Sequence, residues 1–160
     1  MKCAPFAGTL LALALLFAAG SAGAQEFRAT TWMMSRNQVI ASEGGRAVSE
    51  LSQKGQQLVT FETYVDGLPA TITYILENDA LLSASYTFPR DTDRRAWVAM
   101  MQDLTAKNGQ PAFEQENLAG WRLGKTEIAL AHLRDGTTQA AYWEKSYFAR
   151  INHLPIEGTN

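Results

Sequence analysis

Cysteine and histidine, on which many active sites depend, are scarce in this sequence. Its 160 residues include one cysteine, Cys3, and two histidines, His132 and His153. Cys3 lies in an N-terminal segment that we expect to be removed, so the remaining chain would have no thiol for catalysis, for a disulfide or for metal binding. The two histidines lie on separate segments and make a poor zinc site without further ligands. We therefore expect no catalytic residue, no bound metal and no cofactor.

The chain also has little net charge and no long apolar run. Its formal net charge is −2, and its lysines and arginines form no basic stripe. Nucleic acid is therefore not an expected partner. The longest apolar run, at residues 10–19, is too short to cross a bilayer, which takes about 20 residues. We expect no membrane span in the mature chain, and the sequence does not indicate an oligomeric state.

The first 24 residues have the pattern of a secretory signal peptide. Lys2 supplies a positive charge, residues 10–19 are apolar, and an Ala-x-Ala cleavage motif ends at Ala24. We expect cleavage near Ala24 and a periplasmic or secreted mature chain. Residues 25–151 have the length of a single domain, and residues 152–160 have the polarity of a flexible tail.

Two segments have helix patterns. Ser35 and Gln38 have the spacing of a capping box, in which each side chain bonds the backbone amide of the other residue. Gly44 can end this helix because glycine adopts positive φ without strain. Apolar residues at intervals of three and four predict a second helix at residues 93–107.

Six segments have strand patterns and are bounded by turn residues. They are residues 58–65, 68–77, 81–88, 118–123, 126–134 and 137–147. Strands in runs, joined by hairpins and interrupted by helices, are typical of α+β folds with an antiparallel sheet. We predict two helices packed on an antiparallel sheet of about six strands, in the order helix–βββ–helix–βββ.

Three turns fix the predicted strand pairing. The Asp-Gly pairs at residues 66–67 and 135–136 each predict a two-residue hairpin turn. The second turn would place Glu127 directly opposite Glu144. The turn near Asn78 is predicted to be a three-residue loop, at residues 78–80, because that register matches apolar side chains across the strands.

Several short motifs resemble an exported bacterial family of unknown function, whose pattern begins FRxxxWGMS and continues with VxxxE. The matching residues are Phe27-Arg28, Trp32, Met34-Ser35, Val39, Ser42-Glu43, Tyr64, Gly67-Leu68-Pro69-Ala70, Tyr74, Leu82-Ser83-Ala84-Ser85-Tyr86 and Thr126-Glu127-Ile128. More distantly, the helix start before a hairpin is similar to the fold of the small outer-membrane-assembly lipoproteins and of the β-lactamase inhibitor proteins. The resemblance implies an exported α+β domain that acts by binding protein, and it carries over no catalytic residue.

The sequence departs from this pattern at Met33, where the family has glycine. A glycine there would permit a positive φ or a close backbone approach. Met33 argues against both features in this chain, and a change of function at this position is left open.

Two groups of polar residues could carry chemistry. Glu127 and Glu144, if opposite each other, would repel. Either both are exposed near lysines, or one has a raised pKa or an outside partner, and we hypothesise that Glu127 meets Arg28 or another fixed cation. His132 could act as a catalytic base only with an orienting acid and a nucleophile. The alternative is that His132 is a half-buried strand residue with no catalytic role.

The four tryptophans suggest where a partner could bind, because interfaces favour Trp, Tyr and Arg. Trp121, with Arg122 beside it, could form a contact patch, although core packing is the alternative. Trp32 lies beside the first helix and has the same two interpretations. The candidate binding residues are therefore Trp121, Arg122, Trp32, Arg28, Glu127 and Glu144.

The function that we predict from the sequence is non-enzymatic: an exported, periplasmic protein that binds another envelope protein. The alternative is a periplasmic carrier of a small apolar or aromatic ligand, held between sheet and helices. A third possibility is a hydrolase with a site at His132 or at Glu127 and Glu144. A concave cavity of more than a few hundred Å³ lined by Tyr and Trp would favour the carrier, whereas a flat apolar patch would favour the protein partner.

Overall fold

A computed structural model describes residues 26–44 and 46–153 of the chain. The expected signal peptide at residues 1–24 and most of the expected tail at 152–160 lie outside the described residues. The elements, in chain order, are α1 (Arg36–Ser42), β1 (Ser49–Gln53), β2 (Gln56–Val65), β3 (Leu68–Glu77), β4 (Ala80–Phe88), α2 (Arg95–Asn108), β5 (Phe113–Gln115), β6 (Leu118–Leu123), β7 (Thr126–His132), β8 (Thr138–Glu144) and α3 (Lys145–Ile151).

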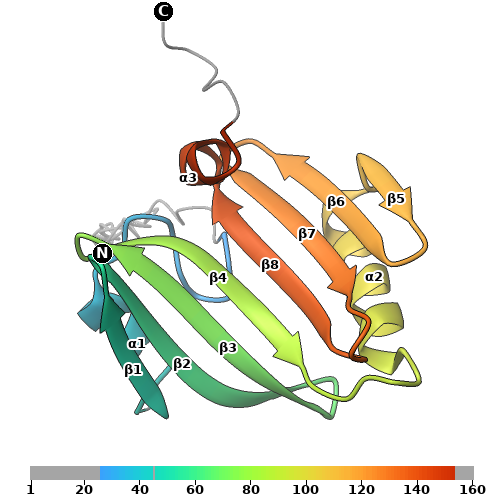
Figure 1. The fold of residues 1–160 in the computed structure, drawn as a ribbon, viewed down its shortest axis with the longest axis horizontal. Coiled ribbons are helices and arrows are strands. Elements are labelled where there is room, and N and C mark those ends of the chain that lie inside the picture. The colour runs from blue at the N-terminus through green and yellow to red at the C-terminus, as the bar shows by residue number, and fades with distance from the viewer. Residues whose placement is uncertain (1–25, 45, 154–160) are drawn as a thin grey trace, which may run out of the picture.

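The eight strands form one antiparallel sheet in the order β1-β2-β3-β4-β8-β7-β6-β5 (Figure 1). The predicted arrangement of two helices on about six strands in helix–βββ order is therefore wrong: the described chain has three helices, and each run holds four strands. The sequence pattern missed β1 and β5 because they are short and all their residues are exposed. With no buried face, neither strand has the alternation of apolar and polar residues by which strands are recognised.

The third helix was missed for a different reason. The strand predicted at residues 137–147 ends at Glu144, where α3 begins. The Glu144 side chain accepts a hydrogen bond from the backbone amide of Tyr147, at 2.8 Å. This bond satisfies one of the free amides of the first helical turn. Glu144 therefore converts the end of a strand into the start of a helix.

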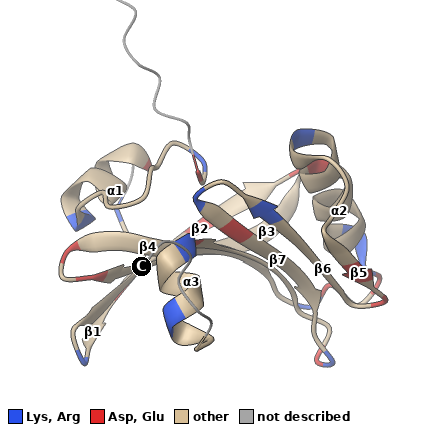
Figure 2. Cartoon of the chain, turned by 90° about the horizontal axis from the view of Figure 1, so that it is seen from above, with Lys and Arg blue, Asp and Glu red and all other residues tan. Residues whose placement is uncertain are grey.

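The helices lie on both faces of the sheet. Helices α1 and α2 cover one face, and α3 lies against the other (Figures 1 and 2). The core lies on the face under α1 and α2 and includes Val59, Ile72, Tyr74, Leu76, Leu81, Ala84, Leu104, Trp121, Leu130 and Ala140. Within residues 26–44 and 46–153, no helix is both long enough and apolar enough to cross a membrane.

The capping box at the start of α1 is confirmed. The Ser35 amide donates to the Gln38 side chain at 2.9 Å, and the Gln38 amide donates to the Ser35 hydroxyl at 3.4 Å. The helix ends before Gly44, whose φ is +63°.

The two Asp-Gly pairs form different turns. Asp66 and Gly67 have φ of +50° and +77°, and Val65 pairs with Leu68, so the predicted two-residue turn is confirmed. In the second hairpin the loop has three residues, 134–136. Leu133 bonds Thr137 across it, the Gly136 amide donates to the Leu133 carbonyl at 3.0 Å, and only Gly136 has positive φ. This is a type I turn followed by a glycine in the left-handed region, and the predicted two-residue turn is wrong here.

The turn near Asn78 also differs from the prediction, but here the loop is shorter than predicted. Glu77 pairs with Ala80, and both Asn78 and Asp79 have positive φ, so the loop has two residues. A register shift beside Leu76 then brings the strands into the predicted register, with Tyr74 opposite Ala84. An irregularity in one strand thus supplies the extra residue that we had assigned to the loop.

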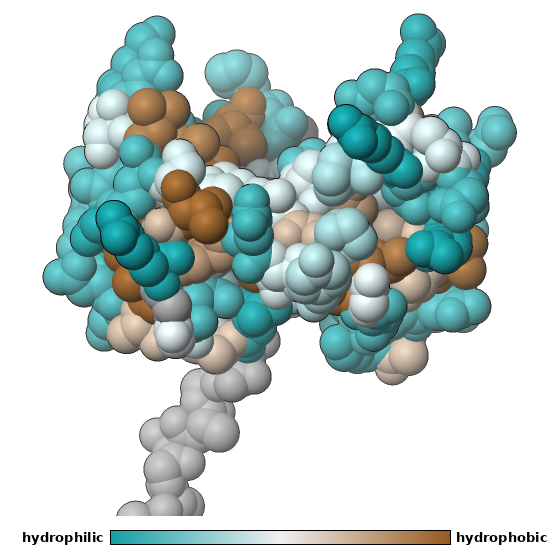
Figure 3. Space-filling view, turned by 90° about the horizontal axis from the view of Figure 1, so that it is seen from below, coloured by the Kyte–Doolittle hydropathy of each residue, from teal (hydrophilic) through white to brown (hydrophobic). Residues whose placement is uncertain are grey.

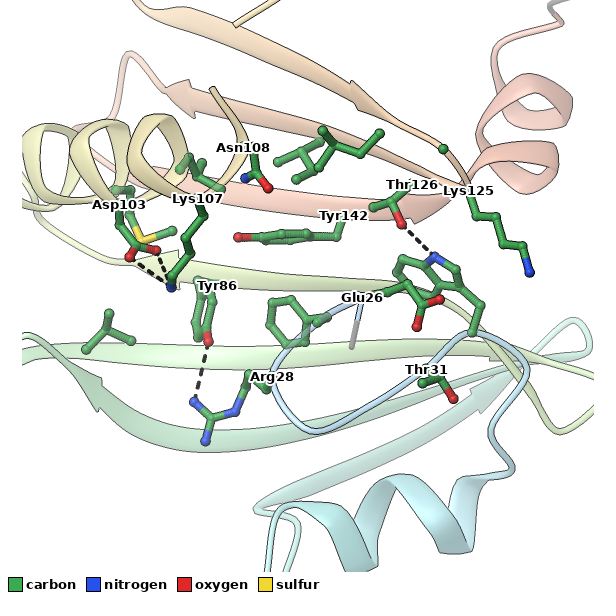
Figure 4. Close-up of a pocket in the computed structure, with 18 of the residues that line it drawn as sticks. Glu26, Arg28, Thr31, Tyr86, Asp103, Lys107, Asn108, Lys125, Thr126 and Tyr142 are labelled. Carbon is green, nitrogen blue, oxygen red and sulfur yellow. Dashed lines mark hydrogen bonds and ion pairs between the residues drawn. The ribbon is translucent and has the colours of Figure 1, made fainter. Parts of the chain in front are cut away.

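Residues 26–34 form an irregular segment, called here the N-terminal segment, that lies on the same face of the sheet as α1 and α2 (Figure 4). The amide of Met33 donates to the carbonyl of Leu81 at 2.9 Å, and the amide of Leu81 donates to the carbonyl of Met34 at 2.9 Å. These bonds tie the segment to the start of β4. Met33 has a φ of +71° and is 64% exposed, so the positive φ that a glycine would favour is present even though the residue is methionine.

Candidate functional site

The described part of the chain has an open groove of about 1080 Å³, called here the central groove. The N-terminal segment forms one wall and α2 the other, and the middle strands β4 and β8 form the floor (Figure 4). The turn at 123–126, between β6 and β7, closes one end. On α2, Met100, Asp103, Leu104 and Lys107 face the groove, at the spacing of one helix face.

The floor of the central groove is aromatic. The Phe27 ring lies 4.8 Å, centroid to centroid, from the ring of Tyr86 and equally 4.8 Å from that of Tyr142. Phe27 is buried, so the N-terminal segment is fixed to the sheet by this contact. Aromatic pairs at this separation stabilise by about 0.5–1.5 kcal/mol each beyond the area they bury.

Arg28 holds one side of the groove. Its Nε donates to Glu43 Oε1 at 2.9 Å. Its Nη1 donates to the Tyr86 hydroxyl at 3.4 Å, as Figure 4 shows. The same Glu43 oxygen accepts from the hydroxyl of Tyr74. Burial acts to lower the pKa of Arg28, but the bonds and charges of Tyr86 and Glu43 outweigh it and raise that pKa, so the guanidinium stays charged.

Lys107 holds the opposite side. Its ammonium lies 2.8 Å from each carboxylate oxygen of Asp103, one helical turn earlier on α2. Its positive charge acts to lower the pKa of Tyr86, although burial raises that pKa overall. Arg28 and Lys107 therefore stand on opposite walls with Tyr86 between them, as Figure 4 shows.

Tyr142 differs from the other groove tyrosine, Tyr86, because no described residue forms a hydrogen bond with its hydroxyl. Its side chain lines the hollow and is only 8% exposed. Burial raises the pKa of its hydroxyl, and the negative charge of Asp103 adds to the rise. Within the described residues no group hydrogen-bonds this hydroxyl. The hydroxyl is not among the buried polar atoms that lack a partner, so it is accessible from the groove, where a bound molecule can form a hydrogen bond with it.

Two of the six predicted binding residues, Arg28 and Trp32, line the central groove. The Trp32 indole donates to the Thr126 hydroxyl at 2.9 Å, at the end of the groove away from Arg28 (Figure 4). Trp32 also contributes to the core, so the two interpretations of this residue are compatible.

The predicted contact patch of Trp121 and Arg122 does not form. Trp121 is 2% exposed and donates to the carbonyl of Gly109 at 2.9 Å, so it is a core residue that holds the end of α2. Arg122 points to the opposite face of the sheet, because neighbouring residues of a strand alternate. There its side chain is 74% exposed.

Glu127 and Glu144 do not form a pair. Glu127 lies opposite Trp143, and Glu144 lies opposite Thr126, because the three-residue loop shifts the register by one. Glu127 has Arg122, and not Arg28, as its cation, at 3.7 Å. Burial raises the pKa of Glu144, but bonds from Ser146 and Tyr147 outweigh it and lower that pKa. Glu144 therefore acts as a charged helix cap.

His132 belongs to a buried hydrogen-bond chain. Its Nδ1 lies 2.9 Å from the Thr138 hydroxyl, which donates to Asp91 at 2.6 Å. Asp91 also accepts from the amides of Ala96 and Trp97 at the start of α2. This chain holds α2 to the second hairpin. Across residues 26–44 and 46–153, no cluster of three or more His, Cys, Asp or Glu side chains could hold a metal ion.

Sequence patterns did not identify most of the groove. Phe27 and Tyr86 were noted as parts of motifs, and Lys107 and Tyr142 only fell within predicted elements. These residues come from distant parts of the chain, and their meeting depends on β4 pairing with β8. The predicted register, with Glu127 opposite Glu144, also placed Tyr142 on the wrong face, because it put Trp143 opposite Ile128, whereas the structure pairs Tyr142 with Ile128.

The comparisons with known proteins give a family. The TP0088 domain matches residues 20–152, so the chain belongs to the TP0088 domain family. No curated protein and no solved structure matches the chain. The family is of uncharacterised function, as is the family that the sequence motifs resemble. The N-terminal pattern and the distant fold similarities stay predictions.

Proposed function

We propose that this member of the TP0088 domain family is a non-enzymatic binding protein that holds a small ligand in its central groove. The observation that carries the proposal is the hydroxyl of Tyr142, which has no partner among the described residues and lines a hollow of about 1080 Å³. We propose further that the protein does this after export, in the compartment to which a signal peptide at residues 1–24 would direct it.

The shape and lining of the groove fit a carrier of a small ligand better than a surface that binds another protein. Small-molecule sites are concave, measure about 300–1,000 Å³, and combine apolar walls with a few placed polar groups. The central groove has this composition, with Phe27, Leu104 and Ile128 beside Arg28 and Tyr142. The contact patch predicted at Trp121 and Arg122 does not form, because Trp121 is buried in the core. Seen from below, the hydrophobic side chains form separate small patches rather than one flat apolar surface (Figure 3).

The tryptophans offer a direct test, because their indole N–H signals are resolved in NMR spectra. Trp32 lines the groove, Trp121 is in the core and Trp143 lies on the opposite face. The protein would be titrated with a library of small aromatic and apolar compounds. We expect hits to shift the Trp32 signal and leave those of Trp121 and Trp143 in place.

A matched pair of variants makes this test specific. Tyr142→Phe removes the hydroxyl in the groove, and Tyr64→Phe removes a hydroxyl from a side chain that is exposed outside it. Tyr142→Phe should weaken the hits that carry a polar group, and Tyr64→Phe should not. If no compound shifts Trp32 at millimolar concentration, or if the shifts map outside the groove, the proposal is wrong.

The predicted binding of another envelope protein remains a second candidate because of one observation, the open edge at β1. This strand is the first in the sheet, so one side of its backbone is unpaired by the sheet, and all five of its residues are exposed. Such an edge can take up an extended segment of a partner as an added strand. Leu51→Lys should abolish capture of that partner, because an edge lysine opposes strand addition. Val98→Lys, an exposed change on α2, should leave capture intact.

A further inference from the structure

We infer that the ligand of the central groove carries a carboxylate, which binds between Arg28 and Lys107, and an apolar body, which extends along Phe27 toward Trp32. This inference rests on the proposed binding function of the groove. It adds the chemical class of the ligand and its direction in the site.

The first argument is a surplus of hydrogen-bond donors at one end of the groove. Arg28 has five N–H donors, of which the described contacts use one for Glu43 and one for Tyr86. The Tyr86 hydroxyl accepts from Arg28, and its own proton has no acceptor among the described residues. The hydroxyl of Tyr142 and one N–H of Lys107 add to this surplus. A ligand that complements these groups must bring acceptors.

The second argument is that the nearby carboxylates are already engaged. Glu43 accepts from Arg28 and Tyr74 through one oxygen, and Asp103 meets Lys107 with both. The other oxygen of Glu43 accepts no bond from a described residue, but neither Glu43 nor Asp103 accepts from the hydroxyl of Tyr86 or Tyr142 in this structure. A ligand carboxylate has two oxygens with about four acceptor positions, which is enough for these donors.

The third argument is that the donors are close together. Tyr86 lies opposite Ala140, so Tyr142 is its diagonal neighbour on the same face of the sheet. Diagonal neighbours in an antiparallel pair are roughly 7–8 Å apart. The Phe27 ring touches both tyrosines, and Figure 4 shows Arg28 and Lys107 on either side of Tyr86. A carboxylate placed here is within reach of donors from the N-terminal segment, α2, β4 and β8.

Glu26 sets the direction. It lines the groove at the end where Thr126 bonds Trp32, away from Arg28 (Figure 4). Its Oε2 is buried and has no hydrogen-bond partner in the described part of the chain. If the carboxylate of the ligand lay against this oxygen, the two negative charges would repel each other in a site of low dielectric. The anionic head therefore belongs at the other end, and the apolar body lies along Phe27 and Ile128.

The test uses matched acids and alcohols that share an apolar body. The pairs are 4-phenylbutyrate with 4-phenylbutanol, 1-naphthoate with 1-naphthalenemethanol, and octanoate with octanol. Each is titrated at pH 7 and low salt, and binding is read from the Trp32 indole signal. We expect at least one acid to bind about tenfold more tightly than its alcohol, because charge-assisted hydrogen bonds are about twice as strong as neutral ones.

Two lysine variants locate the carboxylate. Lys107 and Lys125 both line the groove, at opposite ends (Figure 4). Lys107→Gln should remove most of the preference for the acid, and Lys125→Gln should retain it. Raising the salt concentration should reduce the preference, since the charges are partly exposed.

The outcomes separate this inference from the proposed function. If the alcohols shift Trp32 and bind as tightly as the acids, the groove binds ligands but the carboxylate is wrong. If both lysine variants reduce the preference equally, the assigned position of the carboxylate is wrong. If neither acids nor alcohols shift Trp32, while the wider library also fails, the proposed function falls together with this inference.

Discussion

The two halves of the sheet have the same number of strands but are held in different ways. In the first half, β2, β3 and β4 are joined by two-residue turns whose central residues all have positive φ. In the second half, β7 and β8 are joined by a three-residue loop, and a buried hydrogen-bond chain through Asp91 ties them to α2. Local backbone geometry therefore sets the register in the first half, whereas a long-range polar contact positions the second half.

This difference matters for the central groove, because the groove lies where the halves meet. The pairing of β4 with β8 brings Tyr86 beside Tyr142. The first half contributes Tyr86, and the N-terminal segment bonded to it contributes Arg28. The second half contributes Tyr142 and, through α2, Lys107. Changes that loosen either half should therefore alter the groove, but by different routes.

The largest effect is expected from Asp91→Ala, which breaks the polar contact of the second half. The substitution leaves two helix amides and the Thr138 hydroxyl without their buried acceptor. We expect the free energy of unfolding to fall by about 3 kcal/mol, measured by urea denaturation. Asp93→Ala, two residues away and exposed, should change it by no more than about 0.5 kcal/mol. Equal losses for the two variants would contradict the account.

The same contact predicts a pH dependence. Burial acts to raise the pKa of Asp91, but the bonds from Thr138, Ala96 and Trp97 outweigh it, so the folded pKa is lower than usual. The stabilisation is then fully present above the unfolded pKa, about 3.9, and is lost as the pH falls through the lower folded value. Unfolding curves between pH 6 and pH 2 should therefore show a steeper acid loss for the native chain than for Asp91→Asn. Parallel curves would contradict this prediction.

A proline substitution in each hairpin compares the two turn types directly. Asp66 has a φ of +50°, which proline cannot adopt, so Asp66→Pro should destabilise by about 2 kcal/mol. Arg134 occupies the second position of a type I turn, which favours proline. Arg134→Pro should therefore leave the free energy of unfolding within about 0.5 kcal/mol of the native value. If both prolines are tolerated, or neither is, the assigned difference between the turns is wrong.

The smallest effect is expected at Met33, which joins the N-terminal segment to the first half. A non-glycine residue in the left-handed region lowers the stability of the fold by about 1 kcal/mol. Met33, with a φ of +71°, is such a residue. Met33→Gly should therefore stabilise the protein by about 0.5 kcal/mol, seen as a small rise in the denaturation midpoint. Met33→Ala, which keeps the strain, should not. A loss of stability in Met33→Gly would show that the methionine side chain makes a contribution of its own.

The sequence predicted those features whose causes are local. The capping box of Ser35 and Gln38 depends on residues three apart, and the first Asp-Gly turn depends on two adjacent residues with positive φ. The second Asp-Gly pair was misassigned because the same two residues also fit the end of a three-residue loop. That one-residue error placed Glu127 opposite Glu144 and produced a candidate site that does not exist.

The central groove could not be predicted in the same way, because it depends on long-range pairing. Phe27 and Tyr142 meet only after β4 has paired with β8 and the N-terminal segment has bonded to Leu81. Trp121 illustrates the reverse problem. A tryptophan between two glycines resembles an exposed contact residue in the sequence, but its indole is buried against the end of α2.

The most direct test of the central claim is a crystal structure of the protein grown with the tightest-binding acid from the titrations. The account predicts density for the ligand in the central groove, with its carboxylate near Arg28, Lys107 and the Tyr142 hydroxyl and its apolar body along Phe27. An empty groove with the ligand bound elsewhere on the surface would contradict the account.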